Sequence, residues 1–302
     1  MIPKVKELNL ISMYLYISEL YNSELRFSCQ RFSNNANPAF SDEEILTIYL
    51  FAMTSERKFK IKQIHEYAND YLKSWFPLLP SYVAFNLRIN RLSEAFRLLT
   101  AHLFDSQRPS DCILDQNLLD SMPIITCSGK RNGKVAQAIT DKGYCSTKGM
   151  YYYGSKLHVL AFRRPNHIPF PESYIVTPAS ENDISLFKQE WGEIDNRTFF
   201  GDKIYNNVPF FEQLYSQHNT TMLTPVKKIK GTDIKLEMRD KAANDLFSTS
   251  VSKIRQPIES LFNWYIEKTD IQRASKVRST KGLLIHIFGR IAAAYIFLIF
   301  NS

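Results

Sequence analysis

The sequence predicts an α/β protein in which a mixed β-sheet flanked by helices follows an α-helical N-terminal domain. The first hundred residues have helical patterns, whereas the middle of the chain has three consecutive β-rich runs and then alternating strands and helices. The chain has 302 residues, of which 44% are hydrophobic, and this composition is typical of a globular protein with a sizeable core. A polar segment at 105–110 predicts a boundary between domains 1–105 and 106–302.

Helix signals account for the first domain. Ser41 and Glu44 form a capping-box pattern at the start of a helix, and Pro77 and Pro80 interrupt the helical pattern further on. The expected helices run from Ser41 to Thr54, from Lys62 to Trp75 and from Leu87 to Leu103. Lysine and arginine alternate with aromatic residues at 57–62, so this domain could bind DNA ends; a packed core with a solvated basic face is equally consistent.

The second domain combines short apolar runs with later helices. The expected strands are Cys112–Leu119, Met150–Phe162, Ser173–Thr177, Thr198–Gly201 and Thr220–Thr224, and the expected helices are Val208–Gln217, Ile254–Lys268 and Thr280–Phe300. Residues 227–245 form a polar, basic segment. The last helix is strongly apolar, but Arg290 leaves only the ten residues of Ile291–Phe300 after it, and a bilayer span needs about 20. We therefore expect a buried core helix and no membrane partner.

Basic charge is concentrated at the end of the chain. The net charge is +8, and 14 Lys or Arg stand against 7 Asp or Glu in 225–302. Such a distribution is typical of a protein that binds nucleic acid, although a basic surface without a partner remains an alternative. The side chains expected to neutralise DNA phosphates include Lys227, Lys228, Lys230, Lys276, Arg278 and Lys281.

The cysteine pattern argues against a structural zinc site. Cys29, Cys112, Cys127 and Cys145 are far apart, and none forms a Cys-x-x-Cys pair. The segment Met1–Leu10 carries charges and has no apolar run of the kind found in signal peptides. We therefore expect reduced thiols in a cytoplasmic protein.

Three carboxylates have the context of a metal site. Asp120 follows an apolar strand candidate, Asp202 follows another apolar run, and Glu259 lies in the first turns of a helix. Carboxylates at strand ends and at an early helical turn can converge, and because each raises the pKa of its neighbours, a divalent cation would stabilise the group. Magnesium prefers such oxygen ligands. Spacing alone does not single them out, since Asp115, Asp183 and Asp195 are also candidates.

Several ordered segments resemble those of a known family, the DDE transposases of bacterial insertion sequences. These segments are Leu119–Ile124, Tyr153–His158, Thr177–Asp183, Phe200–Tyr205 and Ile258–Asn263. Upstream, Leu79–Leu92 is similar to the helical N-terminal region of the same proteins, so the resemblance covers roughly Phe40 to Arg290. Within the family, the chain is most similar to the insertion-sequence-982 type of the insertion-sequence-4 superfamily.

The resemblance implies a fold, a reaction and a set of partners. The fold would be an RNase H-like core, with Asp120, Asp202 and Glu259 as catalytic residues and as ligands of magnesium or manganese, with two ions at the site. The enzyme would cleave double-stranded DNA at terminal inverted repeats and join the freed 3′-hydroxyl to target DNA. It would act as a homo-oligomer, a dimer, in the DNA complex, in the nucleoid-associated part of the cytoplasm.

The resemblance also implies DNA contacts, with some departures. In the related superfamily the glutamate belongs to a Tyr–Arg–Glu–Lys signature; Arg255 and Glu259 match it, whereas Ser252 and Ile266 stand at the other two positions. Lys268 is close enough to replace the missing lysine. The expected DNA-binding side chains are Lys156, Lys203, Arg255, Lys268, Lys276, Arg278 and Lys281.

Neighbouring residues have structural interpretations. Lys203 and Arg255 could pair with adjacent acids instead of phosphate, and Lys156 could face DNA or support the site from behind. We expect His158 to be a core histidine, Tyr205 to serve packing, and Asp183 to be a turn or N-cap residue for a helix beginning near Ile184; these last assignments follow ordinary structural preferences.

Two other functions are compatible with the sequence. One is an RNase H-like nuclease that cuts DNA without joining it. The other is a non-catalytic DNA-binding protein that has kept the fold, and the presence of all three acids argues against it.

Overall fold

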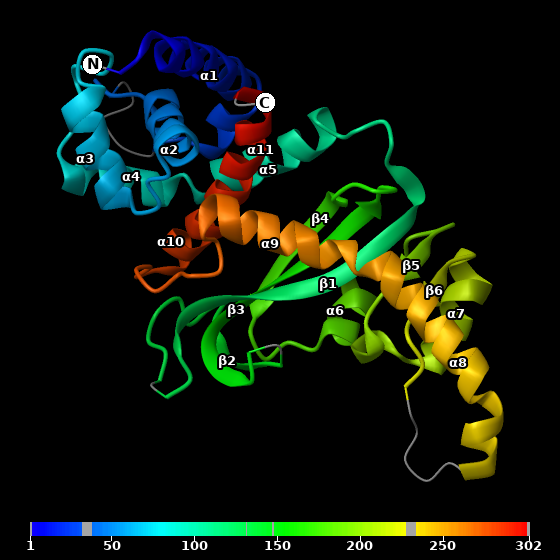
Figure 1. Cartoon of the computed structure of the whole chain (residues 1–302). Helices are drawn as coiled ribbons and strands as arrows, with labels where there is room; N and C mark the ends of the chain where they lie inside the picture. The colour runs from blue at the N-terminus through cyan, green and yellow to red at the C-terminus, as the bar shows by residue number, and fades with distance from the viewer. Residues whose placement is uncertain (1, 32–37, 131, 147, 228–233, 301–302) are drawn as a thin grey trace. The chain divides into compact units, whose positions relative to one another are not determined.

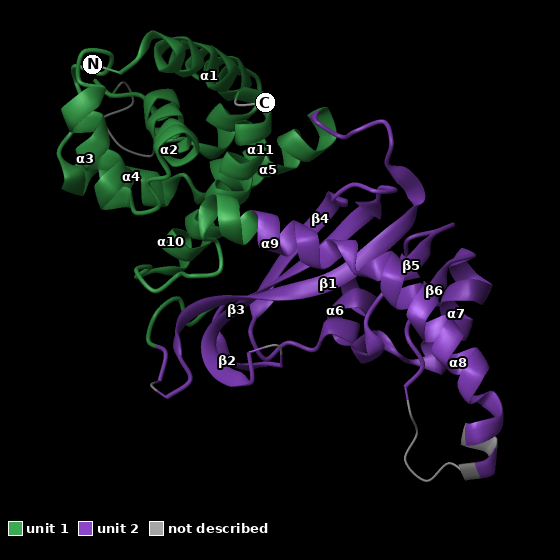
Figure 2. Cartoon of the chain, in the orientation of Figure 1, with its two compact units in different colours: residues 1–106, 134–138, 265–302 green, residues 107–133, 139–264 purple. Residues whose placement is uncertain are grey.

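A computed structural model describes the chain except for residue 1, residues 32–37, 131, 147, 228–233 and 301–302. It divides into two compact units (Figure 2). Unit 1 comprises residues 1–106, 134–138 and 265–302, and unit 2 comprises residues 107–133 and 139–264. The first boundary falls at the polar segment noted above, but the C-terminal helices belong to the same compact unit as the N-terminal ones. The functional division at 105–106 stays a prediction.

Unit 1 is helical in its described part (Figure 1). Its elements are α1 (Lys4–Ser23), η1 (Leu25–Ser28), α2 (Asp42–Glu56), α3 (Ile61–Tyr71), α4 (Tyr82–Arg91), α5 (Ser93–Ser106), the end of α9 (Pro257–Thr269), α10 (Thr280–Leu284), the π-helical turn η3 (Ile285–Gly289) and α11 (Arg290–Phe300). The capping box is confirmed, because the Ser41 hydroxyl accepts from the Glu44 amide and the Glu44 carboxylate accepts from the Ser41 amide. The single helix expected over 87–103 is instead the pair α4 and α5.

The apolar C-terminal helix is a core element of unit 1. Thr280–Phe300 is long and apolar enough to cross a membrane, but 72% of its most apolar window is buried inside the protein. The Arg290 guanidinium donates to the carbonyls of Thr269 and Phe59, and the His286 ring contacts the Ile271 carbonyl at 2.7 Å. Burial of these polar groups is therefore compensated by hydrogen bonds, as in a protein interior.

Unit 2 contains a mixed sheet with helices, as the sequence predicts. Its strands are β1 (Ile113–Ser128), β2 (Asp141–Cys145), β3 (Met150–Arg163), β4 (Phe170–Pro178), β5 (Thr198–Phe200) and β6 (Thr221–Leu223). The order is β2-β3-β1-β5-β6, with β4 also paired to β3; β5 is parallel to β1 and β6, and the other pairs are antiparallel. The helical elements are α6 (Asp183–Glu190), η2 (Lys203–Tyr205), α7 (Val208–His218), α8 (Ile234–Arg255) and the start of α9.

Two expectations for unit 2 were wrong in extent. β1 continues to Ser128, so Asp120 lies within a strand and not at its end. The polar, basic segment 227–245 is helical from Ile234 onward, where α8 begins. The helix expected over 254–268 is interrupted instead, since Pro257 has no amide hydrogen to continue α8 and begins α9.

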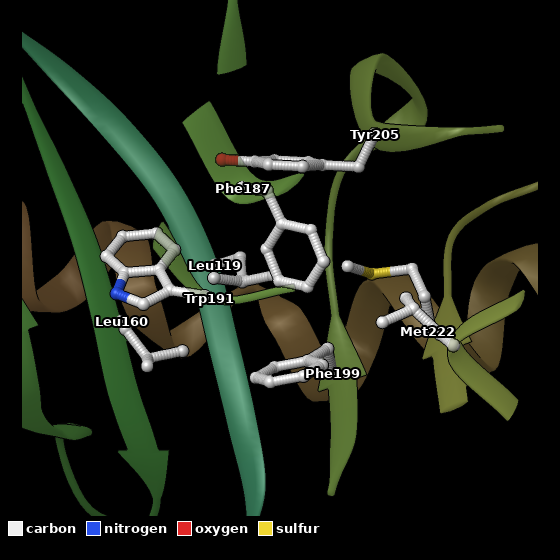
Figure 3. Close-up of a cluster of buried hydrophobic side chains, with 8 residues drawn as sticks. Leu119, Leu160, Phe187, Trp191, Phe199, Tyr205 and Met222 are labelled. Carbon is white, nitrogen blue, oxygen red and sulfur yellow. The ribbon is translucent and has the colours of Figure 1, made fainter. Parts of the chain in front are cut away.

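An aromatic and aliphatic cluster covers one face of the sheet. Figure 3 shows its side chains, which come from β1, β3, α6, the residue that follows α6, β5, η2 and β6. The rings of Phe187 and Phe199 pack edge to face. The labelled members are Leu119, Leu160, Phe187, Trp191, Phe199, Tyr205 and Met222, and Leu214 of α7 completes the cluster. Successive strand residues point to opposite faces, so Asp120, the neighbour of Leu119, points away from this cluster. In Figure 1, α8 runs past β1, β5 and β6.

Candidate active site

The strand register brings two of the expected carboxylates together. β1 and β5 are parallel, and Leu118 is the partner of Phe200. Asp120 lies two residues after Leu118 in β1, and Asp202 lies two residues after Phe200, just beyond the end of β5, so the two aspartates stand at equivalent levels on neighbouring chain segments. This placement explains why Asp202 contributes to raising the pKa of the Asp120 carboxyl.

Asp202 lies directly after β5, where the chain turns sharply. Its carboxylate accepts a hydrogen bond from the Lys203 amide at 2.6 Å and caps η2, and the side chain is exposed. Gly201 is required before it, because a Cβ there would lie 2.9 Å from the buried Tyr205 ring. The short turn therefore directs Asp202 toward solvent while Tyr205 packs in the core.

The Arg255 guanidinium contacts both Asp120 and Glu259. Its Nη1 lies 2.7 Å from Asp120 Oδ2, and its Nη2 lies 2.9 Å from Glu259 Oε1. The Arg255 side chain is largely buried, whereas Glu259 is 54% exposed. Arg255 ends α8 and Glu259 lies in the first turn of α9, four residues later. The same guanidinium therefore links this helix pair to Asp120 of β1, which lies 135 residues before Arg255.

The charges of this site influence one another. Burial raises the pKa of Asp120 to about 6, and Asp202 and Asp183 add to this effect, while Arg255 and the Ser121 amide oppose it. Burial disfavours the charged form of Arg255, but Asp120, Asp202 and Glu259 together raise its pKa. A carboxyl with a pKa near neutrality is typical of sites where acids are crowded and short of compensating charge.

The donor set fits a hard divalent cation. Two aspartates and a glutamate offer only oxygen, which magnesium and manganese accept. Within the described ranges, no three acidic, histidine or cysteine side chains already surround a common point. The reason is visible in the hydrogen bonds, because Arg255 occupies the space between Asp120 and Glu259. A metal ion would compete with this guanidinium for the same oxygens.

A second charged cluster lies on the other face of β3. Lys156 Nζ donates to the Glu181 carbonyl at 2.7 Å and to Asp183 Oδ1 at 3.2 Å. His158 is fully buried; its Nε2 lies 2.8 Å from the Thr177 hydroxyl, and its Nδ1 faces Asp183 at 3.3 Å without hydrogen-bond geometry. Burial lowers the pKa of His158 to about 3, and Lys156 acts in the same direction, so the ring is neutral.

Asp183 has a role that its sequence position did not reveal. The N-cap of α6 is Asn182, whose side chain accepts from the amides of Ile184 and Ser185, so the assignment of Asp183 as N-cap was wrong. Asp183 is instead the first helical residue, is buried, and holds Lys156. The only sequence signal was an Asn-Asp pair at a helix start, which does not distinguish the cap from its neighbour.

The remaining expected DNA-binding residues are divided between the units. Lys203 is exposed next to Asp202 in unit 2. In unit 1, Lys268 lies over the Phe297 ring with its Nζ 5.1 Å from the ring centroid, and the exposed side chains are Lys276, Arg278 and Lys281. Lys227 is exposed, whereas Lys228 and Lys230 lie outside the described residues.

Comparison with known proteins identifies the family. The family model described as transposase DDE domain matches residues 115–296, which is more than half of the chain. The chain belongs to this family. No curated protein and no solved structure matches it. The transposase DDE domain is that of an enzyme acting on DNA, so DNA is the substrate, and the matched range includes all three expected acids.

Proposed function

We propose that this protein is an insertion-sequence transposase that cleaves the ends of its element and transfers the freed 3′-hydroxyl to target DNA. The observation that carries the proposal is the grouping of Asp120, Asp202 and Glu259 around Arg255. Family membership supports the reaction class, and the parallel register of β1 and β5 supports the pairing of the two aspartates.

In the proposed mechanism, Asp120, Asp202 and Glu259 would hold two magnesium or manganese ions. When bound, such ions would supply the positive charge that activates an attacking oxygen and stabilises the leaving one. Arg255 and the exposed Lys203 would bind phosphate oxygens and hold the scissile strand in line. The same carboxylates would serve both cleavage and joining, because both are displacements at phosphorus.

The proposal has finer parts. The catalytic core would be of the RNase H-like type and the element of the insertion-sequence-982 type. Residues 1–105 would bind the inverted repeats, Lys156 would support the site from behind β3, and the basic residues of 265–302 would contact DNA phosphates. The enzyme would work as a dimer with DNA in the cytoplasm. These parts rest on the resemblance of the sequence and on the positions of the charged residues.

The decisive experiment incubates the purified chain with DNA carrying the element's inverted repeats and magnesium. We expect cleavage by the wild type and none by the Asp202→Asn variant. Asp115→Asn is the matched control, since Asp115 is an exposed aspartate of β1 remote from Arg255 in the hydrogen-bond network. Cleavage that survives Asp202→Asn would contradict the proposal.

A strand-transfer assay separates the transposase from a nuclease without joining activity. A pre-cleaved end with a free 3′-hydroxyl should become linked to a target plasmid. Products that are cut but never joined would favour the nuclease. A wild-type protein that binds DNA and neither cuts nor joins it would favour the non-catalytic alternative.

Salt dependence tests the basic interface. If Lys276, Arg278 and Lys281 each neutralise one phosphate, replacing any one by glutamine should make the log–log salt slope shallower by about 0.9. Arg239→Gln is a useful control, because Arg239 is paired with Asp240 on the exposed side of α8.

A further inference from the structure

Helix α1 carries apolar side chains on two opposite faces. One face is buried within unit 1 and packs on α2; its residues are Leu10, Met13, Ile17 and Leu20. The other face is solvent-exposed, although Val5 (72% exposed), Leu8 (65%) and Leu15 (61%) lie on it with Ile11. One buried face is sufficient to attach a helix to its unit, so the second apolar stripe needs a separate explanation.

The exposed residues form a continuous stripe along the helix. They are Lys4, Val5, Leu8, Ile11, Ser12, Leu15, Glu19, Asn22 and Ser23. Their spacing of three or four residues keeps them within about a third of the helix circumference, which is the seam expected for pairing with another helix. The 20 residues of α1 give this seam a length of about 30 Å.

The stripe is self-complementary when two copies run antiparallel. If a two-fold axis passes between Ile11 and Ser12, Leu8 faces Leu15 of the other copy, and Lys4 faces Glu19 of the other copy. Each contact occurs twice, as a closed two-fold interface requires. Ile11 and Ser12 then lie at the axis, the leucines lie on either side of it, and the opposite charges stand at the two ends of the seam.

A parallel arrangement is disfavoured by the same residues. It would place Lys4 beside Lys4 and Glu19 beside Glu19, and like charges facing each other across a helix pair are repulsive. The charges therefore select the antiparallel orientation, while the leucines supply the apolar contact.

We propose that α1 is a homodimerisation surface that pairs antiparallel with α1 of a second copy of this chain in the absence of DNA. The proposal does not depend on the catalytic one. The occupant is a second copy because Leu8 then meets Leu15 and Lys4 meets Glu19 of the same sequence, each twice.

Sedimentation of the full chain over a range of concentrations tests this pairing. The wild type should form a dimer, and Leu15→Glu should weaken it by at least about 100-fold, because two carboxylates would be placed against Leu8 side chains. Leu246→Glu, on an exposed leucine of α8, is the matched control and should leave the dimer intact.

Charge reversal tests the orientation. Lys4→Glu alone and Glu19→Lys alone should each weaken the dimer by about 10-fold, since each creates two repulsive pairs. The double variant Lys4→Glu with Glu19→Lys should restore wild-type affinity. A loss of stability cannot imitate this restoration.

Cysteine cross-linking distinguishes the two orientations directly. In the antiparallel pair, Leu8→Cys combined with Leu15→Cys should form an intermolecular disulfide, and neither single variant should do so beyond the background of the native cysteines. The parallel pair would cross-link each single variant to itself. A monomeric wild type, a dimer broken by Leu87→Glu on α4 but not by Leu15→Glu, or cross-linked single variants would each overturn the proposal.

Discussion

Two carboxylate–cation clusters lie on opposite faces of the same pair of strands, and they differ in how the negative charge is balanced. Asp183 is buried in α6 and held by Lys156. Asp120 shares a single guanidinium with Glu259 and has Asp202 close by. The first cluster is balanced by short contacts inside the protein. The second has more acid than base and is open to solvent at Glu259 and Asp202, so it is the one that can accept a cation from outside.

The largest expected difference between the two clusters is in DNA cleavage. Asp120→Asn should reduce DNA cleavage by at least about 10³-fold without lowering the melting temperature, because it removes a proposed metal ligand and also a poorly compensated charge. Single-turnover cleavage and thermal denaturation measure the two quantities on the same sample. Full cleavage by Asp120→Asn, with Asp183→Asn inactive but folded, would reverse the assignment of the two clusters.

The second test is stability. Asp183→Ala leaves the Lys156 ammonium, largely buried, without its carboxylate, so it should lower the free energy of unfolding by about 3 kcal/mol. Asp195→Ala, which removes an exposed carboxylate, should change it by less than about 1 kcal/mol. Urea denaturation provides both values. Equal effects would show that Asp183 is no more important to folding than a surface acid.

The pH dependence of stability should have opposite signs in the two clusters. The pKa of Asp120 is raised from 3.8 to about 6, so its protonated form stabilises the fold below pH 4 and this contribution, at most about 3 kcal/mol, is lost as pH rises through 6. The pKa of His158 is lowered from 6.5 to about 3, so its neutral form stabilises the fold above pH 6.5 and this contribution is lost as pH falls toward 3.

Single substitutions separate the contributions of Asp120 and His158 to the pH dependence of stability. Relative to the wild type, Asp120→Asn should make the slope of stability against pH more positive between pH 4 and 6, whereas His158→Gln should make it more negative between pH 3 and 6.5. Melting temperatures across the range measure both. If Asp120→Asn does not alter the slope, the carboxyl of Asp120 is not the group that titrates there.

The smallest expected effect is a change in manganese affinity when Arg255 is replaced. Arg255→Gln removes the cation that lies between Asp120 and Glu259, so manganese should bind about 5-fold more tightly, even though cleavage should fall with the loss of the proposed phosphate contact. Calorimetric titration measures the affinity without DNA. Lys253→Gln, an exposed lysine on the same helix, is the control. Weaker manganese binding by Arg255→Gln would indicate that Arg255 organises the carboxylates and does not compete for them.

Local sequence signals were sufficient for part of the fold. The capping box at Ser41 and Glu44 forms as expected, because it depends on residues three positions apart. The mixed sheet and the buried C-terminal helix also follow from runs of apolar residues. The extension of β1 to Ser128 did not follow, because Asp120, Ser121 and Pro123 interrupt the apolar run, whereas the pairing with β3 continues through Ser128.

The sequence by itself determined the three acids as a hypothesis and the family to which they belong, because ordered motif blocks are local in the chain. Only the tertiary structure decided how Asp120 and Asp202 align, through the parallel pairing of strands about 80 residues apart. It also decided that Arg255 bridges Asp120 to Glu259, and that Asp183 faces Lys156 and not the solvent. These contacts join segments distant in the chain, and no local pattern encodes which of 30 acidic residues a given cation will meet.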